Sequence, residues 1–141
     1  MLDAEGVLYW DASAVLSLLF EDQHSAMAIA QMQERCVHLV SSLTWAESHA
    51  VIKRMRRMGA ISDAAVTLAH EQLDHAPWRR ISAGPDRKIT RAMASRWALR
   101  GADLWHLALA RTLQRDLHEI RLVTYSEALR EAAMGEGLTT P

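Results

Sequence analysis

The sequence predicts an α/β fold in which helices cover both faces of a mostly parallel sheet. Short apolar runs of the kind found in buried strands alternate along the chain with longer segments of helical character. Strands joined by helices usually pair in parallel, and such a sheet is buried on both faces. The 141 residues, half of them apolar, suffice for one domain with its own core. We therefore expect a single domain over residues 1–141.

The first half of the chain predicts two strands and three helices. They are a buried strand at 7–10, a helix at 13–20, a helix at 24–34, a strand at 37–41 and a helix from 42 to about 58. The segment 13–20 is apolar on nearly every side, so its helix should be internal. In the segment 24–34, one helical face combines Ala26, Ile29, Ala30 and Gln33. Gly59 should end the long helix, because glycine commonly follows a helix C-terminus.

The second half predicts two more strands and four helices. They are a helix at 62–75, a short strand at 78–82, helices at 87–99 and 102–114, a strand at 120–124 and a helix at 126–134. Ser62 is the expected N-cap of the first of these helices. The sequence Gly84-Pro85-Asp86 should interrupt regular secondary structure and start the helix at residue 87. Glycines at 101, 135 and 137 mark the remaining helix ends.

Three carboxylates, those of Asp11, Glu47 and Asp103, occur in strongly apolar stretches. Burying an isolated charge is costly, so each must be hydrogen-bonded, paired or bound to a cation. All three fall near predicted helix starts, where an acid can simply cap the helix, and Thr44 with Glu47 fits the capping-box pattern. For any one acid considered alone, capping is the favoured interpretation.

Their positions favour a metal site when the three acids are considered together. Glu47 and Asp103 share helix faces with apolar residues, whereas a routine cap would more often be solvated. Asp11 and Glu47 closely follow predicted strands, at the carboxyl edge where open α/β sheets bind ligands. Oxygen ligands without sulfur or paired imidazoles select Mg²⁺ or Mn²⁺. Such ions support phosphodiester hydrolysis.

Four motifs give the chain a resemblance to a known family: VLYWDASAVLSLLFED, SSLTWAES, LRGADLWHLALA and LVTYSEALREAAMGEGL. In this order and spacing they resemble PIN-domain proteins, and more narrowly the VapC-type ribonuclease toxins of bacterial toxin–antitoxin pairs. The resemblance runs from Val7 to Leu138. It implies a PIN-like sheet of about five parallel strands, a homodimer, and a small antitoxin whose tail covers the active site.

The resemblance also assigns candidate catalytic residues. Asp11, Glu47 and Asp103 fall on the family's first three acids and would bind Mg²⁺ or Mn²⁺, and Ser13 falls on the hydroxyl beside the first acid. The implied activity is a metal-dependent endoribonuclease in which an activated water attacks the RNA phosphorus in line.

The sequence departs from the family pattern after the last predicted strand. Family members usually have a fourth acid there, in a Thr-x-Asp pattern, whereas this chain has Thr124, Tyr125 and Ser126. A serine hydroxyl can orient a water but adds no charge, which would weaken a second metal site most. Glu127 could substitute only if the helix start shifts or its longer side chain reaches back.

This departure leaves two alternatives to a ribonuclease. The first is an impaired PIN-fold protein that binds RNA or an antitoxin-like partner without cleaving. The second, less favoured, is a nuclease directed at DNA or at a particular nucleic-acid structure.

Basic and aromatic residues are candidate RNA contacts. One basic run follows Glu47 and includes Lys53, Arg54 and Arg57; a second region comprises Arg79, Arg80, Arg87, Lys88 and Arg91. Each could contact phosphates or simply be a solvated face. The tryptophans beside the acids, Trp10, Trp45 and Trp105, could stack on bases, although a place in the core or an interface is favoured. His106 is interpreted as a core residue, because no second histidine lies close enough for a zinc site.

Charge and cysteine content restrict the remaining possibilities. A net charge of −1 gives no bulk attraction to nucleic acid or membrane, so any polyanion site must be a local patch. The single cysteine, Cys36, excludes an intrachain disulfide. No apolar run approaches the roughly 18 residues that span a bilayer. We expect a soluble cytoplasmic protein.

Overall fold

The computed structural model describes residues 6–138; the outermost parts of the expected domain, 1–5 and 139–141, lie outside the described residues. The described chain confirms the α/β prediction and every predicted strand and helix, with ends that differ by up to three residues. The elements are β1 (Val7–Trp10), α1 (Ala12–Leu19), α2 (Ser25–Met32), β2 (Val37–Ser41), α3 (Ser42–Arg57), α4 (Asp63–His75), β3 (Trp78–Ile81), α5 (Arg87–Arg96), α6 (Gly101–Gln114), β4 (Ile120–Val123) and α7 (Glu127–Gly135).

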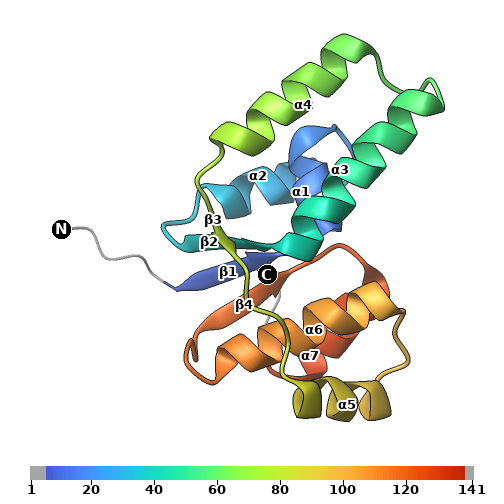
Figure 1. Cartoon of the computed structure of the whole chain (residues 1–141). Coiled ribbons are helices and arrows are strands. Elements are labelled where there is room, and N and C mark those ends of the chain that lie inside the picture. The colour runs from blue at the N-terminus through green and yellow to red at the C-terminus, as the bar shows by residue number, and fades with distance from the viewer. Residues whose placement is uncertain (1–5, 139–141) are drawn as a thin grey trace.

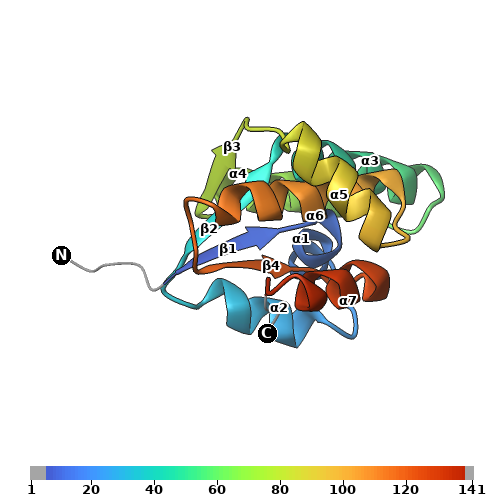
Figure 2. The ribbon, with the colours of Figure 1, turned by 90° about the horizontal axis from the view of Figure 1, so that it is seen from below.

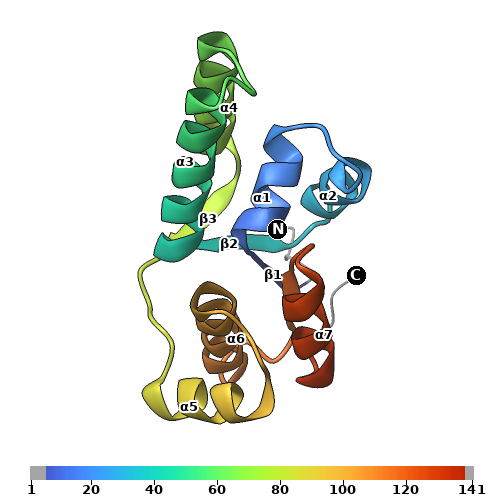
Figure 3. The same cartoon turned by 90° about the vertical axis from the view of Figure 1, so that its right-hand side faces the viewer.

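The sheet is parallel throughout, with the strand order β3-β2-β1-β4. Within residues 6–138 it has four strands rather than about five. The chain moves outward from β1 to β2 and β3, then returns to place β4 on the other side of β1. Helices α1 to α4 cover one face of the sheet and α5 to α7 cover the other (Figure 1, Figure 3). Because the chain leaves β1 and β4 toward opposite faces, their carboxyl ends border the crevice where open α/β sheets bind ligands.

Alternation along β1 divides the core into two clusters. Leu8 and Trp10 pack among the helices α1 to α4, whereas Val7 and Tyr9 pack among α5 to α7. All four residues are buried, as expected for a central strand of a parallel sheet. The central strand therefore extends a polar hydroxyl, that of Tyr9, into the second cluster.

Helix caps are explained by local sequence. Asp11 is the N-cap of α1, and Ser62 caps α4 as predicted. The predicted capping box is wrong: α3 begins at Ser42, and its N-cap Ser41 accepts the backbone N–H of Thr44 at 3.1 Å. Glu47 lies a full turn inside the helix and is free for another role. Gly59 follows α3 with a φ of +74°, a conformation that glycine adopts at no steric cost.

The face predicted for the helix at 24–34 is not the buried one. The structure buries Ala28 and Gln31 of α2, and Ile29 remains half exposed. Gln31 is held inside because its Oε1 accepts the Tyr125 hydroxyl at 2.7 Å. In a helix of mostly small residues, the spacing of apolar side chains does not define one face.

Helices α3 and α4 form an antiparallel arm that extends away from the sheet (Figure 1, Figure 3). The run of basic residues from 53 to 57 lies on the distal half of this arm. None of the helices within residues 6–138 is long and apolar enough to cross a membrane.

Candidate metal centre

The carboxyl ends of β1 and β4 lie side by side and place the first candidate acid (Figure 2). Asp11 directly follows β1, and its backbone N–H continues the pairing by donating to the Val123 carbonyl at 3.1 Å. Only 3 % of the residue is exposed. The sequence left two interpretations of Asp11, a helix cap and a metal ligand. Both remain possible together, because Asp11 caps α1 and also lies at the edge of the sheet where a ligand is expected.

Three donors surround the Asp11 carboxylate. Its Oδ1 accepts the Ser13 hydroxyl at 2.7 Å and the Ala14 backbone N–H at 3.0 Å, and its Oδ2 accepts the Thr124 hydroxyl at 2.5 Å. Burial raises the pKa of Asp11, and the hydrogen bonds from Thr124, Ser13 and Ala14 oppose that rise. No lysine or arginine of residues 6–138 forms an ion pair with Asp11. A buried acid with donors but no counter-charge is a suitable ligand for a cation.

Two hydroxyls link Asp11 to Asp103. Thr124 Oγ1 accepts the backbone N–H of Ser126 at 3.1 Å, and Ser126 Oγ donates to Asp103 Oδ2 at 3.1 Å. Ser13 supports the same loop, because its Oγ accepts the backbone N–H of Tyr125 at 2.9 Å. Asp103 lies half-buried in the first turn of α6. The serine at the expected fourth-acid position thus joins the first and third acids into one network.

Glu47 belongs to a second chain of hydrogen bonds. His106 Nε2 lies 2.6 Å from Glu47 Oε1, and His106 Nδ1 lies 2.5 Å from the Tyr9 hydroxyl. The Tyr9 hydroxyl in turn lies 2.8 Å from Ser41 Oγ. With a neutral imidazole, Nε2–H donates to the carboxylate, Tyr9 donates to Nδ1 and Ser41 donates to Tyr9. Burial raises the pKa of the Tyr9 phenol well above its usual value, so the phenol stays neutral and can donate.

The side chains of this site are of the kinds that bind a divalent metal ion, but the three carboxylates do not converge on one point. In the part of the chain that the structure describes, no three His, Cys, Asp or Glu side chains stand together as a metal cluster. Asp11 and Asp103 share the hydroxyl bridge, whereas Glu47 is turned toward His106. Its side chain is 32 % exposed, so part of it borders solvent rather than packed core. Carboxylate and hydroxyl oxygens are donors that suit Mg²⁺ or Mn²⁺.

The other predicted site residues lie outside this network. Glu127 is exposed at the start of α7 and makes no hydrogen bond or ion pair within residues 6–138, so no contact joins it to the acids there. Lys53, Arg54 and Arg57 are exposed on the arm, which puts Arg57 about 15 Å along the helix axis from Glu47. Trp10 is fully buried, as favoured for it, while Trp45 and Trp105 are half-buried.

Sequence reasoning missed the partners of Glu47. His106 is buried as predicted, but it contacts an acid rather than only apolar neighbours. The sequence places Tyr9 in a buried apolar strand and gives no indication of a role for its hydroxyl. A usable signal was present, because a histidine three residues after Asp103 lies on nearly the same helix face and can meet another acid of the site.

Comparisons with known proteins show the family to which this fold belongs. The PIN domain family model matches residues 8–134. A crystal structure of the protein PAE2754 from Pyrobaculum aerophilum is similar, with a TM-score of 0.67, 18 % sequence identity, and coverage of 96 % of this chain and 83 % of the other. At that identity the likeness concerns the fold alone. A search of curated proteins finds no significant match. Since the family model spans nearly the whole chain, including every acid of the candidate centre, this protein belongs to the PIN-domain family.

Proposed function

We propose that this protein is a metal-dependent endoribonuclease, the toxin component of a toxin–antitoxin pair. PIN domains are generally metal-dependent nucleases, which supports the reaction class. The observation that carries the proposal is the state of Asp11: buried, surrounded by three donors and without a cationic partner in the described chain. A fold retains such a costly group where it has a ligand to bind. The choice of RNA and of a toxin role rests on the VapC-like motifs.

Each residue of the centre has a separate task. Asp11, Asp103 and Glu47 would hold Mg²⁺ or Mn²⁺, which, when bound, neutralises phosphoryl charge and activates water for attack on phosphorus. Ser13 and Thr124 fix the Asp11 carboxylate in one orientation, and Ser126 fixes Asp103. His106 orients Glu47 through the hydrogen bond between its Nε2 and Glu47 Oε1. Hydrolysis forms one P–O bond to water and breaks one to the leaving ribose oxygen, so no further reactant is required.

The proposed partners are a cognate antitoxin and a second copy of this chain. The support for both partners is the resemblance to VapC-type toxins. The large apolar side chains that are exposed, each between 44 % and 75 %, come from four different elements: Met27 and Ile29 of α2, Met58 after α3, Leu68 of α4 and Met134 of α7. Single exposed apolar side chains are normal on a protein surface, so they do not add to this support.

The test is cleavage of a single-stranded RNA by the purified chain with Mn²⁺, with Mg²⁺ and with EDTA. We expect cleavage with either metal and none with EDTA, and Asp11→Asn should lower the rate at least a hundredfold while the variant stays folded. A matched single-stranded DNA at the same salt separates a ribonuclease from a DNA-directed nuclease. Metal-dependent cleavage that survives Asp11→Asn unchanged would refute the proposed mechanism.

A second candidate function is RNA or partner binding without cleavage. Two observations favour it: the neutral Ser126 hydroxyl at the position of the fourth acid, and the orientation of Glu47 toward His106. Under this alternative, RNA binds in EDTA and is not cleaved with Mn²⁺. Ser126→Asp would then be expected to create or strongly increase cleavage.

A further inference from the structure

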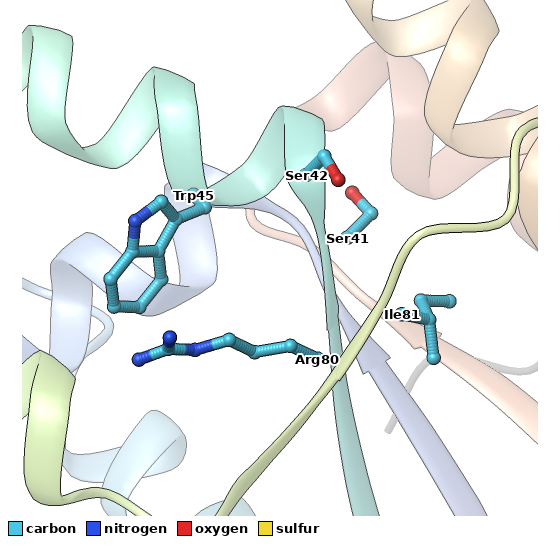
Figure 4. Close-up of a pocket in the computed structure, with 5 residues that line it drawn as sticks. All are labelled: Ser41, Ser42, Trp45, Arg80 and Ile81. Atoms are coloured by element: carbon cyan, nitrogen blue, oxygen red, sulfur yellow. The ribbon is translucent and has the colours of Figure 1, made fainter.

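A cavity of about 180 Å³ lies between the start of α3 and the end of β3, outside the acid network. Its lining consists of Ser41, Ser42, Trp45, Arg80 and Ile81 (Figure 4). Three neighbouring elements contribute these residues: the end of β2, the first turn of α3 and the edge strand β3. The lining contains an arginine, two hydroxyls and no acid.

Arg80 is held in one orientation by Trp45. The guanidinium carbon lies 4.0 Å from the centroid of the Trp45 ring, and Figure 4 shows the arginine side chain running alongside the indole. Such cation–π stacking orders the guanidinium and leaves its N–H edge available. Within residues 6–138, Arg80 forms no ion pair. The cavity therefore has an ordered positive charge that forms no ion pair within the described residues.

The cavity communicates with the acids through Ser41. Ser41 is one of the lining residues, and its hydroxyl forms a hydrogen bond with Tyr9, whose hydroxyl bonds His106, which bonds Glu47. Thus one imidazole, one phenol and one hydroxyl separate the cavity from the rim of the candidate metal centre. Both sites lie at the carboxyl ends of the β-strands, so one extended RNA strand can contact both of them.

We propose that this cavity binds a backbone phosphate of the RNA strand, close to the phosphate at the acids. The Arg80 N–H groups and the Ser42 hydroxyl are donors that match the acceptor oxygens of a phosphate, and a stacked arginine favours bidentate phosphate recognition. The inference rests on the proposed function, which identifies the bound nucleic acid as RNA. It makes Arg80 a binding residue and Trp45 a residue that acts through Arg80.

The strand β3 supplies a matched control. Arg79 precedes Arg80, carries the same charge and is also exposed, but successive strand residues point to opposite faces. Trp78 and Arg80 pack toward the side of Trp10 and Trp45, and Arg79, on the other side of the strand, is not among the residues that line the cavity. Arg79→Ala and Arg80→Ala therefore remove equal charge from adjacent positions, and only the second empties the cavity of its guanidinium.

The experiment measures binding of a labelled short oligouridylate by fluorescence anisotropy, in an Asp11→Asn background that prevents cleavage, from about 50 to about 200 mM salt. We expect Arg80→Ala to reduce the slope of log affinity against log salt by about 0.7, as for one lost single-strand phosphate contact. Affinity at low salt should fall at least fivefold. Arg79→Ala should change affinity less than twofold. Arg80→Lys, which keeps the charge without the stacked plane, should fall between them, and melting curves verify that every variant is folded.

Equal effects of Arg79→Ala and Arg80→Ala, or no effect of Arg80→Ala, would overturn the inference. Failure of this inference differs from failure of the proposed function. If the unmodified chain cleaves RNA while Arg80→Ala binds normally, only the phosphate site is wrong. If Arg80→Ala weakens binding while the unmodified chain never cleaves with Mn²⁺, the phosphate site stands and the ribonuclease proposal fails. If the chain binds no RNA at any salt, both fail.

Discussion

Tyr9→Phe removes one oxygen from the buried chain that ends at Glu47, and it should destabilise the fold by about 2 kcal/mol. The magnitude follows from the partners of the hydroxyl. Its removal leaves His106 Nδ1 without a hydrogen bond in a residue that is 1 % exposed. Ser41 Oγ loses one partner but keeps the backbone N–H of Thr44. One orphaned buried group costs about 1–3 kcal/mol, and the loss at Ser41 adds less.

Thermal unfolding followed by circular dichroism measures the effect. For a chain of this size, about 2 kcal/mol corresponds to a fall in Tm of about 8 °C. Ser95→Ala is the control for losing one hydroxyl, because the Ser95 hydroxyl donates only to the Arg91 carbonyl and lies on an exposed part of α5. It should cost less than about 1 kcal/mol.

A double-mutant cycle then tests whether Tyr9 acts through His106. In a His106→Leu background, Tyr9→Phe should cost at least about 1 kcal/mol less than in the native chain, because the orphaned nitrogen is gone. Equal costs in both backgrounds, or a loss for Tyr9→Phe no larger than that of Ser95→Ala, would refute the assignment of this chain of hydrogen bonds.

Three further predictions concern the acid count, pH and the basic arm. Ser126→Asp should lower the half-saturating Mg²⁺ concentration for RNA cleavage on the order of tenfold, because it adds a charged ligand beside Asp103; an unchanged metal dependence would show that three acids suffice. Burial lowers the pKa of His38, whose neutral Nδ1 accepts Trp10 Nε1–H at 3.0 Å. The unfolded chain therefore takes up this proton first as pH falls, so the stability contributed by neutral His38 is complete above about pH 6.5 and is lost as pH falls further toward the folded pKa. Urea unfolding at pH 7.5 and pH 5.5 should show a smaller loss for His38→Gln than for the native chain, and equal losses would contradict the reasoning. Replacing Lys53, Arg54 and Arg57 together by alanine should weaken binding of an RNA long enough to reach the arm and leave a short oligonucleotide unaffected; equal weakening of both would place these residues at the centre instead.

The fold was predictable because each buried strand leaves a local signature. Val7–Trp10 is a short apolar run, and its burial on both faces is what a central strand of a parallel sheet requires. The buried face of α2 was not predictable in the same way, because its small side chains allow more than one face to pack inward. The hydrogen bond from Tyr125, far away in the sequence, determines which face is buried.

The candidate site was predictable in its acids and not in its connections. Asp11 follows a strand, so its position at the sheet edge could be inferred from local sequence. Contacts between Glu47 and His106, or between Asp11 and Thr124, join residues far apart in the chain, and only the tertiary fold brings them together. The pairing of Arg80 with Trp45 depends on β3 lying beside β2, which no local pattern specifies.

A structure determined after soaking crystals in Mn²⁺, with the ion located by its anomalous scattering, tests the central claim most directly. The account predicts an ion held by oxygens of Asp11 and Asp103 at about 2.0–2.2 Å, with Glu47 rotated away from His106 to join them. An ion bound elsewhere, or no ion at the carboxyl ends of β1 and β4 while Glu47 remains on His106, would contradict it.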